Sequence, residues 1–445
     1  MMKKQDFYKR IPILLTALFL FVLTGLVIEN ASASQLIWSV NSTSVSTNSI
    51  TEEAEDYDYI YIAGADRGTG EWRIEKRQKS NGGVTWIQED VYLPPVGAYS
   101  IDADDDSIYV SGAESDSGDI YWRVQRRNQV DGEIIWDKLH PGGTSLAYAV
   151  KADGNEIFVG GQGQFVSRRI EKRNKSDGEI DWYWQPNNSN ARGRLYSITT
   201  DENYVYACGA WSSDKKKWLV EKRQKSDGQV MWDDELDISV VYPFIVAQSI
   251  IADENYVYVV GGDLHEDWNY WRIEKRSKAN GALVWWKKVD QGGDACAYSV
   301  SADNDYLYIA GMVTDLWTIE KRNKSDGELV WIIKEDYSSK RPRSIIASCD
   351  DFLYITGDGR IEKRSKTSYV DIGLRGYDEG SGPIAIAAEP LGTLTSPLRI
   401  AKDTDDDTVP ETWGIVLVDP GTSSDSGMRI KTSSGDIKAL GKYSE

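Results

Sequence analysis

Short runs of alternating apolar and polar residues recur through the middle of the chain, separated by Gly, Asn and Asp. Residues 297–333 show the pattern well, because four runs rich in β-branched and aromatic residues follow one another there. Such runs predict β-strands, and the polar turn residues between them predict hairpins. The four predicted strands are Ala297–Ala302, Tyr306–Met312, Trp317–Lys324 and Glu328–Ile333.

The same unit occurs seven times. Each copy carries an aromatic residue with Gly three positions later, and successive copies lie 46 to 52 residues apart. A period of this size is typical of a β-propeller or a solenoid. The seven aromatic residues are Tyr61, Tyr109, Phe158, Tyr206, Tyr258, Tyr308 and Tyr354.

Six of the seven copies carry a Trp in their last predicted strand, and the seventh lacks it. The segment Leu36–Val40, before the first copy, contains Trp38 in the same kind of run. We predict that this N-terminal strand completes the seventh unit and closes a ring, because a linear stack would need no such exchange. The predicted fold is all-β: a seven-bladed β-propeller over residues 34–366, closed by the N-terminal strand and followed by a small C-terminal β-rich module.

Polar residues that repeat in every unit are expected to be structural. The third strand carries Glu-x-Arg or Gln-x-Arg in all seven copies, for example Glu221 and Arg223. A period of two puts the pair on one face, where Arg can bridge carboxylates between blades or stack on Trp. One chain is not expected to carry seven identical active sites, so a structural role is predicted for each pair. Lys-Ser-Asp-Gly segments supply Gly for the tight third-to-fourth turn.

The segments Asp177–Trp182 and Asp326–Trp331 resemble the pyrroloquinoline-quinone-like β-propeller repeats. The resemblance covers residues 35–366 and implies that a Gly-Trp strand docks each blade against the next. The family includes quinone-dependent dehydrogenases, scaffold proteins of outer-membrane assembly and binding proteins. Seven units instead of the usual eight, and the lack of an adjacent Cys pair, speak against a dehydrogenase. The sialidase Asp-box does not match either, because Trp182 lies four residues after Gly178 rather than three.

Residues 367–445 form the predicted C-terminal module. Five strand-like runs are separated there by Gly, Pro, Ser and Asp, at Ile384–Ala388, Leu398–Ala401, Trp413–Val418, Met428–Thr432 and Ile437–Leu440. Alternate carboxylates in this module could gather around Ca²⁺, although Thr408 stands where calcium loops use Gly and acidic loops are often only solvated. No cofactor is expected, and calcium is the one candidate metal. Its candidate ligands are Asp403, Asp405, Asp407 and Glu411.

Composition narrows the function. The chain has 445 residues with 51 basic and 70 acidic side chains, a net charge of -19. Nucleic acid is therefore excluded as an expected partner, because phosphate neutralisation needs an excess of Lys and Arg. Only two His residues are present, which leaves little room for His-based catalysis or a multi-His metal site.

Residues 1–33 are interpreted as a secretory signal peptide. Basic residues precede the apolar run Ile11–Ile28, and Ala31–Ala33 fits the small-residue cleavage pattern. The run is long enough to span a bilayer, so an uncleaved anchor is the alternative. In either case the remaining chain is expected to be secreted, periplasmic or on the cell surface. We expect no transmembrane domain after cleavage, and we expect a monomer.

Ligands of propellers usually contact the loops that lead into first strands and those between second and third strands. Positions at which the copies differ are the better candidates, because the repeated strands are scaffold. Aromatic residues with Arg at such positions suit sugar stacking or a protein hot spot, although each could simply pack on the ring. The candidate residues are Tyr183, Trp184, Arg192, Arg194, Trp211, His265, Trp268, Trp286, Tyr337, Arg341 and Arg343.

The hypothesis that we favour is an exported, non-enzymatic binding module that recognises an extracellular or envelope polysaccharide or protein through this loop face. An assembly scaffold of the cell envelope is the first alternative. A quinone-dependent or carbohydrate-active enzyme is the second, and no catalytic residue is assigned because no catalytic motif is present.

Overall fold

The computed structural model describes residues 31–32, 34–41, 45–52, 58–66, 69, 71–90, 97–116, 118–140, 145–186, 192–212, 216–236, 246–265, 268–289, 295–337, 340–367 and 369–370, together with five later strands. Contacts divide the chain into two compact units. One unit is Leu36–Lys366, and the other combines Met1–Gln35 with Thr367–Glu445.

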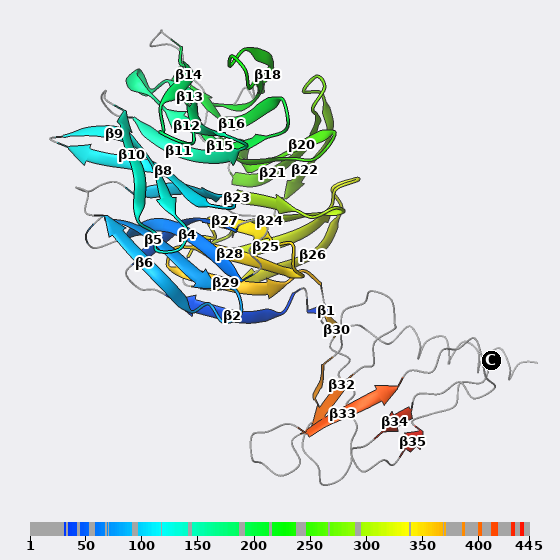
Figure 1. The fold of residues 1–445 in the computed structure, drawn as a ribbon. Coiled ribbons are helices and arrows are strands. Elements are labelled where there is room, and N and C mark those ends of the chain that lie inside the picture. The colour runs from blue at the N-terminus through cyan, green and yellow to red at the C-terminus, as the bar shows by residue number, and fades with distance from the viewer. Residues whose placement is uncertain are drawn as a thin grey trace, which may run out of the picture. The chain divides into compact units, whose positions relative to one another are not determined.

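The first unit is a seven-bladed β-propeller whose blades are four-stranded antiparallel sheets (Figure 1). Blade 1 contains β3 (Val45–Thr51), β4 (Tyr59–Asp66), β5 (Trp72–Gln78) and β6 (Val84–Asp90). Blade 2 contains β7 (Ala98–Ala103), β8 (Ser107–Asp116), β9 (Asp119–Asn128) and β10 (Ile134–His140). Blade 3 contains β11 (Leu146–Asp153), β12 (Glu156–Gln162), the short 3₁₀ turn η1 (Gln164–Val166), β13 (Arg168–Asn174) and β14 (Ile180–Trp184).

The remaining blades repeat this order. Blade 4 contains β15 (Arg192–Thr200), β16 (Tyr204–Ser212), β17 (Lys216–Gln224) and β18 (Val230–Leu236). Blade 5 contains β19 (Val246–Ala252), β20 (Tyr256–His265), β21 (Trp268–Ser277) and β22 (Leu283–Val289). Blade 6 contains β23 (Ala295–Ala302), β24 (Tyr306–Val313), β25 (Leu316–Asn323) and β26 (Leu329–Glu335). Blade 7 contains β27 (Ser344–Ala347), β28 (Phe352–Gly357), β29 (Arg360–Ser365) and β2 (Leu36–Asn41).

The N-terminal strand closes the ring, which confirms the prediction. β2 pairs antiparallel with β29, with Trp38 opposite Lys363. The indole N–H of Trp38 donates to the carbonyl of Lys79 in blade 1 at 3.0 Å. Trp232 makes the same bond from blade 4 to the carbonyl of Lys278 in blade 5, also at 3.0 Å. The seam of the ring therefore uses the same contact as an internal blade interface.

First strands form the inner ring. Each first strand contacts the first strand of the next blade, from β3 round to β27 and back to β3. Serine hydroxyls support this ring, because the oxygen of Ser249 in β19 accepts the backbone N–H of Val300 in β23. The same bond joins Ser299 in β23 to the backbone N–H of Ile345 in β27.

The core lies between blades rather than inside them. Tyr61 and Trp72 of blade 1 pack with Ile101 and Ile108 of blade 2 in one buried cluster. Trp72 is fully buried, and its indole N–H donates to the carbonyl of Ala113 in blade 2 at 2.9 Å. A blade has two apolar faces, so it becomes stable only when both neighbours cover it.

Glycine is required at two repeated positions. Gly281 has φ +74°, in the left-handed region, and a Cβ there would lie 2.8 Å from the Trp232 ring of the preceding blade. The Gly of the aromatic-x-x-Gly signature has a different role. A Cβ on Gly209 would overlap the carbonyl oxygen of Arg194, where β15 bulges between Leu195 and Ser197. The signature therefore marks a bulge in the inner strand.

The Glu-x-Arg pairs are buried scaffold. The Arg223 guanidinium donates to Glu221 at 2.8 Å and to the carbonyl of Gly228 at 3.0 Å, which fixes its own third-to-fourth turn. Its guanidinium also lies 3.8 Å from the centroid of the Trp184 ring in blade 3. The pair shares one face and reaches the preceding blade, as predicted.

The second unit contains a five-stranded antiparallel sheet in chain order, formed by β31 (Ala385–Ala387), β32 (Arg399–Lys402), β33 (Glu411–Val416), β34 (Arg429–Lys431) and β35 (Ile437–Ala439). The five strands predicted for this module overlap these five. A separate pair joins β1 (Ala31–Ser32) to β30 (Tyr369–Val370). No helix among the described residues has the length and apolar character needed to cross a membrane. The apolar run 11–28 lies outside the described residues.

Candidate functional site: the rim of the loop face

The two ends of the ring carry different connections. We call one end the loop face: it carries the connections between second and third strands and those that lead into the next first strand. The opposite end, the turn face, carries the first-to-second and third-to-fourth turns, such as 253–255 and 278–282 in blade 5. The antiparallel order within each blade fixes this division.

Eight of the eleven predicted ligand residues lie in strands, which corrects their expected placement in loops. The strands extend further toward the loop face than the apolar pattern indicated. These residues are Tyr183 and Trp184 in β14, Arg192 and Arg194 in β15, Trp211 in β16, His265 in β20, Trp268 in β21 and Trp286 in β22. The other three, Tyr337, Arg341 and Arg343, lie between β26 and β27.

Several predicted positions fall outside the described residues. The side chains of Arg192, Trp211, His265 and Trp268 belong to this group, although their backbone lies in strands. The candidate calcium ligands Asp403, Asp405 and Asp407 also lie outside the described residues, as does the side chain of Glu411. Their proposed roles stay predictions.

Two predicted ligand residues pack between blades. Trp184 is half-buried under the guanidinium of Arg223, as described above, and Tyr337 lies between blades 6 and 7. The Tyr337 hydroxyl donates to Glu335 at 2.9 Å, and the Arg360 guanidinium lies 3.8 Å from its ring centroid. These contacts give both residues a structural role, and their role in ligand binding stays a prediction.

Two others are more open. Tyr183 is 59% exposed, with the Arg169 guanidinium 4.1 Å from its ring centroid. Trp286 is 44% exposed, and the Arg272 guanidinium lies 4.6 Å from its ring centroid. Each ring therefore has an Arg on one side and solvent access on another, which suits contact with a ligand.

A more coherent set of residues contains Arg343, which the sequence predicted, and six residues that the sequence did not indicate. In six blades one residue of the inner strand lies near its loop-face end, where the register of the strand shifts. In blade 7 Arg343 occupies the equivalent position, directly before β27. All seven side chains are half-buried. We call them the rim residues: Asn48, Tyr99, Tyr148, Tyr196, Gln248, Tyr298 and Arg343.

The rim is aromatic over three consecutive blades. The ring centroids of Tyr99 and Tyr148 are 5.3 Å apart, and those of Tyr148 and Tyr196 are 5.2 Å apart. Across the ring, the Arg343 guanidinium lies 5.6 Å from the centroid of Tyr298. The rim thus combines a row of phenol rings with a cation held near another phenol.

The rim phenols stay protonated at neutral pH. Burial raises the pKa of Tyr298 to about 12, and it also raises the pKa values of Tyr99 and Tyr148. Among the residues that the structure describes, the hydroxyls of these three tyrosines form no hydrogen bond with another side chain or backbone group. They are therefore available as hydrogen-bond donors and acceptors to a ligand.

Arginines flank the rim. The Nε of Arg194, at the start of β15, donates to the side-chain oxygen of Gln162 at 2.6 Å, and the Arg194 side chain is exposed. The Nε of Arg343 donates to Asp358 at 3.3 Å. The exposed Arg341 binds the same carboxylate through its backbone N–H at 3.1 Å. These bonds fix the guanidinium groups of Arg194 and Arg343 without neutralising Arg194.

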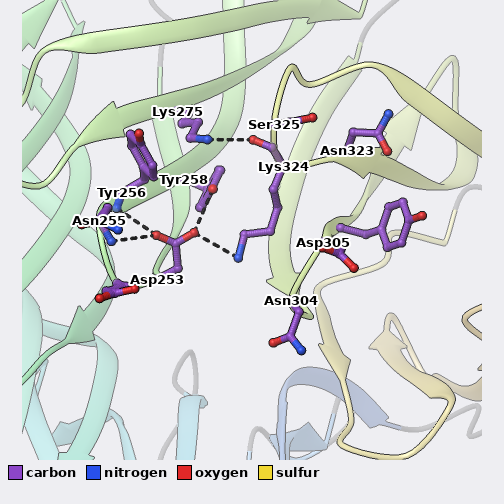
Figure 2. Close-up of a pocket in the computed structure, with 12 residues that line it drawn as sticks. Asp253, Asn255, Tyr256, Tyr258, Lys275, Asn304, Asp305, Asn323, Lys324 and Ser325 are labelled. Atoms are coloured by element: carbon purple, nitrogen blue, oxygen red, sulfur yellow. Dashed lines mark hydrogen bonds and ion pairs between the residues drawn. The ribbon is translucent and has the colours of Figure 1, made fainter.

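On the turn face, one carboxylate ties neighbouring blades together. Asp253 in blade 5 accepts the hydroxyl of Tyr258 at 2.9 Å and the ammonium of Lys324 in blade 6 at 3.0 Å (Figure 2). Burial alone would raise the pKa of Asp253, but these bonds and two backbone N–H groups lower it. Asp201, Tyr206 and Lys278 repeat the arrangement between blades 4 and 5.

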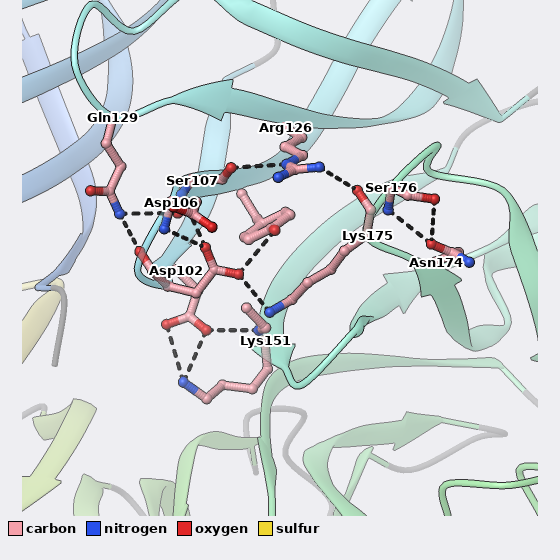
Figure 3. Close-up of polar contacts among 12 residues, drawn as sticks. Asp102, Asp106, Ser107, Arg126, Gln129, Lys151, Asn174, Lys175 and Ser176 are labelled. Carbon is pink, nitrogen blue, oxygen red and sulfur yellow. Dashed lines mark hydrogen bonds and ion pairs between the residues drawn. The ribbon is translucent and has the colours of Figure 1, made fainter.

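One ion pair lies on the inner strands themselves. The Lys151 ammonium contacts both carboxylate oxygens of Asp102, at 2.9 and 3.1 Å (Figure 3). The backbone N–H of Ala152 donates to the same carboxylate at 2.7 Å. Asp102 raises the pKa of Lys151, so this amine stays protonated and is not a nucleophile at neutral pH. The pair is suited to holding blades 2 and 3 together.

Two solved structures are similar to this chain. The crystal structure of BamB from Moraxella catarrhalis matches with a TM-score of 0.47 and 12% identity, over 75% of this chain and 99% of that chain. The crystal structure of the WD40 β-propeller domain of Doa1 matches with a TM-score of 0.51 and 11% identity, over 75% of this chain and 97% of that chain. No family model and no curated protein matches the sequence. The resemblance to the quinone-type repeats therefore stays a prediction, while the β-propeller fold is established.

Proposed function

We propose that the chain is an exported binding protein that holds a protein partner or a polysaccharide on the loop face of its propeller. Export rests on the predicted signal in residues 1–33. A ring closed through matched blade contacts provides a rigid support, and ligand residues on rigid elements need less ordering when they bind.

The single observation that carries this proposal is the rim. Its neighbours repeat from blade to blade, as in Ala98 and Ser100 around Tyr99, or Ala247 and Ser249 around Gln248. The rim residue itself changes between Tyr, Gln, Asn and Arg. A position that varies within an otherwise constant frame is one that the scaffold does not require.

The chemistry of the rim favours a protein segment over a polysaccharide. Tyr and Arg are the residues most often enriched in the energetic centres of protein interfaces, because they combine large contact area with hydrogen bonding. Tyr99, Tyr148 and Tyr196 supply adjoining rings, and Arg194 and Arg343 supply cations. An extended segment with carboxylate and apolar groups would complement this set.

The test uses residues 34–445 immobilised and exposed to envelope extract and culture medium of the source cells, with a polysaccharide array in parallel. We expect a partner that the wild type retains and the Tyr99→Ala/Tyr148→Ala variant loses. Asp227→Asn, on the turn face, is the control and should retain it, because Asp227 is exposed there and lines none of the hollows of that face. Equal retention by the wild type and the rim variant would contradict the proposal. A polysaccharide hit that requires the same tyrosines would keep the site and change the ligand class.

A stable complex that co-purifies in fixed stoichiometry would favour an assembly scaffold, whereas reversible capture would favour a binding module. The same rim variant separates both from contacts elsewhere on the ring.

A further inference from the structure

The turn face carries hollows between consecutive blades that the proposed function does not use. One of about 700 Å³ lies between blades 5 and 6, and one of about 470 Å³ lies between blades 4 and 5. A third, of about 440 Å³, lies between blades 2 and 3. All three volumes fall in the range of small-molecule sites.

The hollow between blades 5 and 6 contains polar groups without an internal role. Tyr256 and Tyr306 both line it, together with the amides of Asn255, Asn304 and Asn323 (Figure 2). Among the described residues, these three amides and the two phenol hydroxyls form no hydrogen bond with another group. They contrast with Asp253, Tyr258 and Lys324, whose polar atoms bind one another.

Each phenol ring is held in place by an ammonium. The Lys275 nitrogen lies 3.9 Å from the centroid of Tyr256, and it donates to the carbonyl of Lys324 at 3.0 Å. The Lys321 nitrogen lies 3.9 Å from the centroid of Tyr306. A cation over the ring limits the motion of each phenol, so the hollow has fixed aromatic surfaces.

The hollow between blades 4 and 5 repeats this chemistry and shares Glu254, Asn255 and Tyr256 with the first hollow. Tyr204 and Tyr256 line it, with Asn255, Lys222 and Lys278. The Lys222 nitrogen lies 3.7 Å from the centroid of Tyr204, as Lys275 does for Tyr256. Tyr256 therefore lines both hollows, whereas Tyr204 lines one and Tyr306 the other.

The hollow between blades 2 and 3 departs from this pattern. Ser107 and Glu156 begin the second strands there, where the other two hollows have Tyr. Tyr109, its only lining phenol, donates to Asp104 at 3.0 Å and is buried. Arg126 occupies part of the wall, and its guanidinium donates to the carbonyl of Lys175 at 3.2 Å (Figure 3). This hollow has no exposed aromatic surface and provides an internal control.

We propose that the hollows between blades 4 and 5 and between blades 5 and 6 are two saccharide-binding sites. A sugar ring has an apolar C–H surface and a polar hydroxyl edge. The rings of Tyr256 and of Tyr204 or Tyr306 can contact the apolar C–H surface of the sugar. The Asn amides, which both donate and accept hydrogen bonds, can bind its hydroxyl groups. The polar lining disfavours an apolar ligand, because burying its amides without partners costs free energy.

Calorimetry and saturation-transfer NMR test this with residues 34–445 and the methyl glycosides of glucose, galactose, mannose, fucose, N-acetylglucosamine and N-acetylgalactosamine. We expect at least one of them to bind with a dissociation constant of about 1 mM and two sites per chain. Tyr256→Ala should abolish both sites, whereas Tyr204→Ala and Tyr306→Ala should each leave one. Arg126→Ala, in the third hollow, should leave both.

The pattern of stoichiometries decides the outcome. Failure of all six glycosides to bind at concentrations well above millimolar would overturn the proposal, and so would unchanged binding in the Tyr256→Ala variant. Circular dichroism confirms folding, and Tyr256→Phe, which keeps the ring and its contact with Lys275, should weaken binding without removing a site. The rim variant Tyr99→Ala/Tyr148→Ala should keep both saccharide sites, so failure of this proposal and failure of the proposed function are distinguishable. Tighter binding of a polymer than of its methyl glycoside would identify a polysaccharide as the natural source.

Discussion

Closure of the ring by the N-terminal strand can be tested with one substitution, Trp38→Ala. The indole N–H of Trp38 donates to the carbonyl of Lys79, a bond whose loss costs about 1 kcal/mol. Its ring contacts Gly82 and lies 6.2 Å from the centroid of Tyr354. Burial of a large apolar side chain contributes roughly 1.5–3 kcal/mol, and Trp38 is only half-buried. We therefore expect the free energy of unfolding to fall by about 2–4 kcal/mol, within the range for core truncations.

Trp232→Ala is the matched control, because Trp232 makes the same contacts between blades 4 and 5. Its indole N–H donates to Lys278 at 3.0 Å, its ring contacts Gly281, and its centroid lies 6.3 Å from that of Tyr206. Urea unfolding of residues 34–445, followed by circular dichroism, should give similar losses for the two variants. A loss below about 0.5 kcal/mol for Trp38→Ala, beside a full loss for Trp232→Ala, would refute closure, since changes that small are typical of surface positions.

Three further outcomes follow from local geometry. Gly281→Ala should lower the melting temperature more than Gly118→Ala. Both glycines have positive φ, where an Ala costs roughly 1–2 kcal/mol, but only at Gly281 would the added Cβ lie against a Trp ring. Equal shifts in a thermal melt would contradict this. In a native thiol-labelling assay, Cys349 should react at once and Cys208 only after unfolding, because Cys349 is exposed while burial raises the pKa of Cys208; early labelling of both would count against the packing. The pKa of Asp253 in the folded protein is lowered from 3.8, so its contribution to stability is present above about pH 4 and is lost as the pH falls further. The Asp253→Asn variant should be less stable at neutral pH, and its free energy of unfolding should fall less steeply below pH 4. An identical fall in both proteins would exclude the ion pair as a source of stability.

The repeat made the propeller predictable. Seven aromatic-x-x-Gly signatures set the number of blades, and the missing Trp in the last copy identified β2 as its partner strand. Both features carry strong physical constraints: Gly209 must admit the bulge of the inner strand, and Gly281 must accept the Trp of the preceding blade. Cys208, Cys296 and Cys349 stand in apolar strand-like runs, which predicts buried thiols. Cys208 is buried and Cys296 is half-buried, but the prediction is wrong for the exposed Cys349. A single residue at the end of a strand has no periodicity to indicate its orientation.

The candidate site was less predictable, because most of its residues lie at the ends of strands, whereas ligand residues of propellers are expected in loops. Trp184 and Tyr337 differ between copies, and difference alone made them candidates, yet each packs against Arg side chains from a neighbouring blade. Contacts between blades join residues about fifty positions apart, and a pattern along one copy does not reveal them. The rim could have been found by aligning the copies on their Ala-x-Ser inner strands, where x is Tyr99 in one blade and Gln248 in another.

The rim differs from the blade interfaces in which of its residues repeat. From blade 2 to blade 6, repeated Asp and Lys side chains such as Asp253 and Lys324 bind one another across the blade interfaces, whereas among the described residues the hydroxyls of the rim residues Tyr99, Tyr148 and Tyr298 form no hydrogen bond. Because the contacts between blades are made mainly by repeated residues, a change of one of these three rim tyrosines removes no hydrogen bond between blades. We therefore expect a substitution of Tyr99 to leave the ring closed. The repeated residues thus supply most of the contacts between blades, and at the rim we expect specificity at the positions that differ from blade to blade.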